Sequence, residues 1–94
     1  MLLRQIQCFC AVCEEGSFTK AARRLYITQS AVSQQMKNLE TDLGVSLFQR
    51  GGRNLVLSEA GRVFYERTRT VISDIDQARI EVRAVAEHTS SRLR

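Results

Sequence analysis

The 94-residue sequence contains no proline and no long hydrophobic run. Its N-terminal stretch MLLRQIQCFC is interrupted by Arg4, Gln5 and Gln7, so it lacks the continuous apolar core of a signal peptide. A membrane-spanning helix needs about 20 consecutive apolar residues, and no segment approaches that length. These absences exclude a transmembrane span and favour a soluble, intracellular protein.

Side chains that could support catalysis or bind a metal are also scarce. The single histidine, His88, is isolated, and the three cysteines are too crowded on one predicted helix to form a disulfide framework. A metal site at Cys8, Cys10 and Cys13 is conceivable, but Cys8 would face away from the other two, which favours a packing role. No acid and base pair, activated nucleophile or Gly-rich phosphate loop occurs, so we expect no enzyme, metal or cofactor in this chain.

Acidic residues are absent from one long stretch of the chain. The formal net charge is +4, and residues 16–39 hold only basic charges, whereas residues 58–94 carry both signs in similar numbers. The basic side chains of the acid-free stretch are Lys20, Arg23, Arg24 and Lys37. This distribution permits a polyanionic partner next to residues 28–44 without requiring one.

Without proline, the glycines are the strongest helix breakers, and they divide the chain into blocks. Apolar residues at helical spacing predict a first helix over 2–15, which Gly16 ends in the left-handed conformation. The serine that follows can cap a short second helix. Thr28 can cap a third helix over about 29–43, which Gly44 ends. Two helices joined by a short turn predict a helix-turn-helix.

A hairpin is predicted after the third helix. The segments VSLFQR and RNLVL flank Gly51 and Gly52, a strong turn pair, and predict two short strands. Such strands are too short to be stable alone, so they must pack on the helices as a wing. Arg50 and Arg53 bracket the glycines. Arg53 either lies on a plain exposed turn or contacts the backbone or minor groove of a nucleic acid.

A long helix is predicted over 58–88, because the helical period continues there without a breaker after Gly61. Its apolar residues alternate between spacings of four and three, as in a coiled coil. Such a helix would be about 46 Å long and would extend beyond a small domain. Most of its apolar residues, which form a seam along one face of the helix, therefore need a partner. The simplest partner is the same helix of a second chain. The predicted dimer interface is Phe64, Thr68, Val71, Ile75, Ala78, Val82 and Val85.

The third predicted helix has a polar side that begins at its N-terminus. This side carries Ser30, Ser33, Gln34 and Lys37. Amphipathicity alone leaves a merely solvated face open. However, hydroxyl and amide side chains replace the Glu and Lys pairs that are usual on exposed helices, and such groups can approach base edges closely. Backbone N–H groups at the helix start favour phosphate, so a helix that enters a groove end-first is the preferred interpretation.

Several motifs occur together in one order. They are EEGSF at the end of the first helix, the small pair Ala21 and Ala22, the stretch TQSAVSQQMKNLE, the sequence LGVSLFQR, Arg53, and LSEAG at the start of the long helix. With this joint spacing, the chain from Leu3 to about Arg94 resembles the N-terminal DNA-binding region and linker helix of LysR-type transcriptional regulators.

The resemblance implies a mainly α fold, a winged helix-turn-helix of three helices and a two-stranded wing, followed by a long linker helix. Such proteins bind double-stranded DNA as homodimers through antiparallel linker helices, usually at an interrupted inverted repeat. The implied base contacts come from Gln29, Ser30, Ser33 and Gln34, and the implied backbone contacts from Thr28, Gln35, Lys37 and Arg53. Commoner members have proline in place of Ser30 and arginine in place of Gln34. A glutamine there favours adenine or backbone contact over guanine.

We therefore expect a DNA-binding domain over 1–57, a linker and dimerisation helix over 58–88, and a hinge over 89–94. The hinge would lead to an effector-binding domain that this chain lacks. The resemblance places a small-molecule inducer in that domain and allows a tetramer of the intact protein. The predicted function is sequence-specific DNA binding by a cytoplasmic, nucleoid-associated transcriptional regulator, with no membrane partner. The alternative is a dimerisation or protein-interaction module that binds no nucleic acid.

Overall fold

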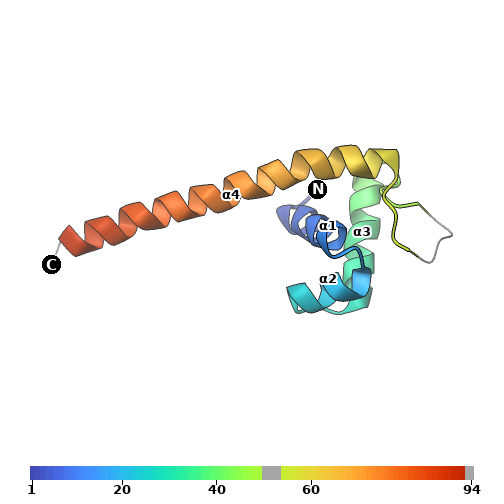
Figure 1. Ribbon diagram of the computed structural model, residues 1–94, viewed down its shortest axis with the longest axis horizontal. Coiled ribbons are helices and arrows are strands. Elements are labelled where there is room, and N and C mark those ends of the chain that lie inside the picture. The colour runs from blue at the N-terminus through green and yellow to red at the C-terminus, as the bar shows by residue number, and fades with distance from the viewer. Residues whose placement is uncertain (50–53, 93–94) are drawn as a thin grey trace.

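The computed structural model describes residues 1–49 and 54–92 and is mainly helical. Its helices are α1 (Leu3–Glu15), α2 (Phe18–Leu25), α3 (Gln29–Leu43) and α4 (Glu59–Arg92). The first three form one unit at the N-terminal end of α4, and the rest of α4 projects away from it (Figure 1). The molecule extends over 60 × 25 × 20 Å, so α4 sets its long dimension. Within the described ranges, no helix is long and apolar enough to cross a membrane.

The predicted ends of the first three helices are confirmed. Gly16 and Gly44 adopt left-handed φ values of 68° and 73°, and each ends the helix before it. The Ser17 and Thr28 hydroxyls accept first-turn backbone N–H groups of α2 and α3 at 3.2 and 3.0 Å. Local capping therefore sets the boundaries of the helix-turn-helix, in which α2, a short turn and α3 follow one another.

The turn between α2 and α3 contains a feature that the sequence did not predict. Tyr26 adopts the left-handed conformation, with φ 58°, and its side chain is 95% exposed. Its backbone N–H donates to the carbonyls of Ala22 and Arg23, which satisfies the last turn of α2. The unusual backbone conformation thus closes α2 and lets the chain reverse direction before Thr28 caps α3.

The core lies where α1 and α3 meet the segment that follows α3. Its largest fully buried side chains are Phe9, Val12, Val32, Met36, Leu39 and Leu47. The Phe9 ring centroid lies 5.8 Å from that of Phe48 and 5.3 Å from that of Phe64. The first turns of α4 are therefore part of the same core.

Two residues of the predicted dimer seam contact their own chain. Phe64 packs on Phe9, and Thr68 is only 5% exposed, with its hydroxyl 3.4 Å from the Sγ atom of Cys10. The four-and-three spacing could not separate a contact with α1 from a contact with a second chain, because both bury the same helix face. Phe64 and Thr68 therefore contact α1 within one chain, and their assignment to a seam between chains remains a prediction.

The remaining seam residues lie further along α4. Ile75 is half-buried, and the others, Val71, Ala78, Val82 and Val85, are exposed. Val82 and Val85 keep 68% and 66% of their surfaces exposed. This part of the helix has an apolar face that no other part of the described chain covers.

The long helix extends beyond its predicted end. The sequence analysis ended it at residue 88 and expected an extended hinge over 89–94, but α4 continues to Arg92. No glycine or proline follows Gly61, so nothing in the sequence interrupts the backbone hydrogen bonds of this helix. The division into regions 1–57, 58–88 and 89–94 remains a prediction.

The two-stranded wing is not confirmed. Among the described residues no strand forms, and a single antiparallel bridge joins Phe48 to Leu57. The backbone N–H of Ser58 donates to the carbonyl of Leu47, but the Leu47 N–H, which a longer ladder would use, donates instead to Oε2 of Glu40 on α3. The predicted turn glycines, Arg50 and Arg53 lie outside the described residues.

Gly61 allows the close contact between α4 and the core. A Cβ atom at this position would overlap the carbonyl oxygen of Leu47. Alanine normally stabilises a helix interior by about 1 kcal/mol relative to glycine. Here we expect Gly61→Ala to lower the free energy of unfolding by about 1 to 3 kcal/mol, because the backbone of α4 or of Leu47 must move to make room for the added Cβ atom. Thermal unfolding at one fixed protein concentration tests this, with Ser73→Ala at an exposed position of α4 as control. A Gly61→Ala protein as stable as the control would contradict the steric argument.

Candidate nucleic-acid interface

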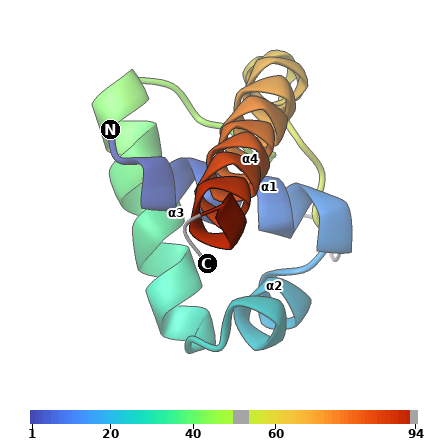
Figure 2. The same ribbon diagram turned by 90° about the vertical axis from the view of Figure 1, so that its left-hand side faces the viewer.

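The N-terminal end of α3 lies on the side of the helical unit away from α4. Figure 1 shows α3 running toward α4 from the α2–α3 turn, and Figure 2 shows the same arrangement along α4. Val32, Met36 and Leu39 bury one face of α3 in the core. The opposite face and the first turn are therefore available to a large partner, and α4 does not obstruct them.

The four predicted base-contacting residues lie on this available part of α3. Gln29, Ser30 and Gln34 are exposed, and Ser33 is half-buried. The Thr28 cap fixes the first turn, which carries Gln29 and Ser30, and Ser33 and Gln34 follow on the second turn. Gln34 is held by a neighbour on the next turn, since its Nε2 atom donates to Oδ1 of Asn38 at 3.0 Å.

The predicted backbone-contacting residues are less uniform. Thr28 and Lys37 are exposed, whereas Gln35 is half-buried. The Thr28 hydroxyl accepts the cap bond through a lone pair, so its own hydrogen can still be donated to a phosphate oxygen. Arg53 lies outside the described residues.

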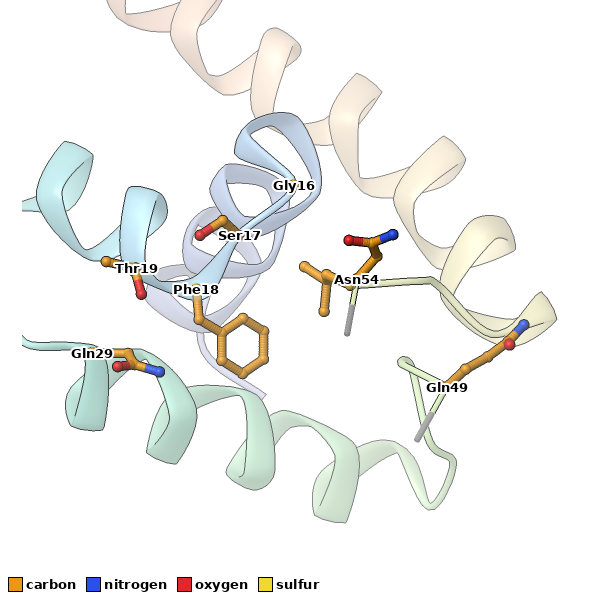
Figure 3. A pocket seen from close by; sticks show the side chains of 8 residues that line it. Gly16, Ser17, Phe18, Thr19, Gln29, Gln49 and Asn54 are labelled. Carbon is orange, nitrogen blue, oxygen red and sulfur yellow. The ribbon is translucent and has the colours of Figure 1, made fainter. Parts of the chain in front are cut away.

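An open cleft of about 540 Å³ lies beside the start of α3. Its polar lining residues come from three segments: Ser17 and Thr19 from the start of α2, Gln29 from α3, and Gln49 and Asn54 from either side of residues 50–53 (Figure 3). The sequence analysis had not singled out Thr19, Gln49 or Asn54. Only the fold brings these separate segments together, so no local pattern could have identified them.

The basic residues of the acid-free stretch have different roles. The Arg24 guanidinium contacts carboxylate oxygens of Glu14 at 2.7 Å and Glu15 at 3.3 Å, which ties α2 to α1. Lys20 and Arg23 are exposed on α2. Positive charge near the start of α3 therefore comes from these two residues and Lys37 rather than from Arg24.

The cysteines pack in the protein interior. Cys8 and Cys10 are buried and Cys13 is half-buried, and all three are free thiols. Burial raises the pKa of Cys13 to about 12 and also raises the pKa values of the other two. Protonated thiols are poor nucleophiles and poor metal ligands at neutral pH. In the described part of the chain, no cluster of three or more His, Cys, Asp or Glu side chains could hold a metal ion.

Glu40 connects α3 to the segment that leads to residues 50–53. Its Oε2 atom accepts the backbone N–H of Leu47 at 2.7 Å and the Ser46 hydroxyl at 3.3 Å. Leu47 is fully buried, so its N–H needs this partner. The sequence analysis assigned no role to Glu40.

Comparisons with known proteins agree with this architecture. Residues 3–62 match the family described as bacterial regulatory helix-turn-helix protein, lysR family. The HTH-type transcriptional activator CmpR of Synechocystis sp. is 44% identical over 75 residues, 80% of this chain and 25% of CmpR. The HTH-type transcriptional regulator ClcR of Pseudomonas putida is 40% identical over the whole chain and 32% of its own length.

The fold is also similar to that of a protein solved with DNA. The BenM DNA-binding domain in its crystal complex with benA site 1 DNA has a TM-score of 0.86 and 41% identity, over 92% of this chain and 97% of that one. The architecture and the exposed first turn of α3 define a helix-turn-helix protein with a long C-terminal helix. The chain belongs to the LysR family of bacterial regulatory helix-turn-helix proteins. It spans less than a third of the length of the transcriptional activator CmpR and of the transcriptional regulator ClcR.

The Glu40 contacts make a stability prediction. Glu40→Ala removes the acceptor of the buried Leu47 N–H and is expected to lower the free energy of unfolding by about 1 to 3 kcal/mol. Glu40→Gln keeps an acceptor oxygen of similar reach and should lose clearly less. Chemical denaturation of both variants tests the difference, and equal losses would show that the hydrogen bond to Leu47 is not the cause.

Proposed function

We propose that this chain is the DNA-binding part of a transcriptional regulator and that α3 reads base edges in the major groove. The observation that carries the proposal is the exposed, polar first half of α3. Thr28 caps its first turn, Gln29, Ser30 and Gln34 are exposed, and this end of the helix lies away from α4 (Figure 1). The major groove is about 12 Å wide and admits one helix. Glutamine amides can pair with adenine, and serine hydroxyls can donate or accept, so these side chains, together with Ser33, suit direct readout.

Contacts to the DNA backbone would surround this helix. Thr28, Gln35 and Lys37 flank the base-contacting residues on α3, and the polar cleft between α2 and α3 gives further groups that can bond phosphate oxygens. We infer that residues 45–57 form a two-stranded wing and that Arg53 contacts the DNA backbone or minor groove. The bridge from Phe48 to Leu57 supports a hairpin there.

A second copy of the chain would complete the DNA-binding unit. An antiparallel α4 from a second chain could cover an apolar strip along α4. The strip consists of the seam residues Val71, Ile75, Ala78, Val82 and Val85. A homodimer has twofold symmetry and presents two α3 helices, so its operator would be an interrupted inverted repeat. Phe64 and Thr68 would support this interface from within each chain.

The remaining parts of the proposal concern the whole protein. Its relatives are much longer than this chain, so a larger effector-binding domain would follow α4 and would bind the small-molecule inducer. Dimers could associate there into tetramers. The chain itself would need no cofactor and would catalyse no reaction, and it would act at the nucleoid in the cytoplasm.

The alternative function is a dimerisation or protein-interaction module. A titration of binding to short duplexes against salt concentration separates the two. DNA binding through phosphate contacts weakens steeply as salt rises, because counterions are released on binding. Failure to bind any duplex at low salt would reject DNA binding in favour of the alternative.

Gln29 and Lys37 should affect binding differently. Gln29→Ala is expected to change the preferred base at one position of each half-site, with a loss of about 1 to 3 kcal/mol for the preferred sequence. Lys37→Ala should weaken binding to all duplexes alike and reduce the slope of log K against log salt by about 1. Titrations with duplexes that differ at single positions measure both effects. Equal losses of affinity on every duplex for both variants would contradict this division of roles.

The dimer interface can be tested at Ile75. Ile75→Asp would place a charge at the middle of the proposed seam, so it should convert the dimer to monomers in sedimentation. Gln77→Asp, at an exposed position on another face of α4, is the matched control and should remain dimeric. An unchanged dimer for Ile75→Asp would place the interface elsewhere.

A further inference from the structure

The Gln34 side chain is already held in place in the free protein. Its Nε2 atom donates to Oδ1 of Asn38 at 3.0 Å, and both side chains are exposed on the surface of α3. The two residues are four apart, so they are neighbours on one helix face. A free glutamine side chain samples many rotamers, and a contact that restricts it reduces the entropy lost when it binds a partner.

The bond to Asn38 leaves Gln34 able to pair with adenine. A glutamine amide has two N–H donors and one carbonyl acceptor. One of the two N–H groups of Gln34 donates to Asn38. The second N–H and the carbonyl oxygen are the two groups that adenine N7 and N6 require. The same arrangement is poorly suited to guanine, which presents only acceptors on its major-groove edge.

Asn38 itself lies further from the end of α3 that would enter the groove. It is one turn beyond Gln34 and about 15 Å along the axis from the Thr28 cap. The major groove is about 8.5 Å deep. Gln34 lies about 9 Å along the axis from the cap, close to this depth, so in an end-first approach its side chain can still reach a base edge when the shorter side chain of Asn38 cannot.

We propose that Asn38 is a positioning residue that orients Gln34 for adenine and so sets base preference at one position of each half-site. This inference rests on the proposed function, since it assumes that α3 reads DNA. Asn38 contributes to specificity through Gln34 alone and makes no base contact of its own.

The test is a double-mutant cycle with the Asn38→Ala and Gln34→Ala variants, measured on duplexes that carry each of the four bases at the position read by Gln34. Asn38→Ala should reduce the preference for adenine about threefold to tenfold, while affinity for the other duplexes stays the same. In the Gln34→Ala background, Asn38→Ala should cause no further change.

Two further variants test whether the hydrogen bond from Gln34 to Asn38 is the cause of the adenine preference. Asn38→Asp keeps an acceptor at the same place, so it should retain the adenine preference even though its negative charge weakens binding to all duplexes. Thr41→Ala is the matched control, because its exposed hydroxyl donates to the carbonyl of Lys37 and not to a predicted base-contacting side chain. It should leave the preference unchanged.

Three results would overturn the positioning role of Asn38. They are an unchanged adenine preference in Asn38→Ala, an effect of Asn38→Ala that persists without Gln34, and a lost preference in Asn38→Asp. If one of these results occurs in a parent protein that binds duplexes and whose Gln34→Ala variant loses the adenine preference, the proposed function stands while this inference fails. A parent protein that binds no duplex would overturn both.

Discussion

The packing of Phe9 is the interaction on which the rest of the structure depends. This fully buried ring on α1 contacts Phe48, which follows α3, as well as Phe64 and Tyr65 at the start of α4. One side chain therefore joins the helix-turn-helix, the hairpin segment and the long helix. Because α4 is fixed to this core through Phe64 and Thr68, the direction of α4 relative to α3 is set within one chain. The spacing between two α3 helices in a dimer would then follow from the α4 contact alone.

Much of the fold was predictable because its boundaries are local. Gly16 and Gly44 end helices, and Ser17 and Thr28 begin them, through contacts within a few residues. Features that depend on long-range contacts were missed. The spacing of α4 could not reveal that Thr68 meets Cys10, and no pattern indicated that Glu40 bonds the Leu47 backbone. The segment after α3 also depends on tertiary contacts, since its Leu47 N–H bonds to Glu40 of α3 and not to a neighbouring strand.

The candidate site could be located from sequence but not resolved into individual roles. Gln29, Ser30 and Gln34 are exposed and Ser33 is half-buried, since the apolar period of α3 fixes which face is buried. Sequence reasoning assigned a backbone contact to Lys37 among the basic residues of the acid-free stretch, but it could not show that Arg24 is paired with Glu14 and Glu15. Likewise, sequence reasoning did not predict that the Gln34 amide donates to Asn38 on the exposed surface of α3. Hydrophobic periodicity predicts which face of a helix is buried, so it cannot predict which exposed side chains bond to one another.

The central claim is that α3 reads a specific DNA sequence as one of a symmetric pair. Selection of bound duplexes from a random pool, followed by sequencing, tests this claim most directly. The account predicts an enriched inverted repeat with two equivalent half-sites at one fixed separation, because a twofold dimer presents two identical α3 helices. Bound duplexes without any enriched sequence, or with a single unrepeated site, would contradict it.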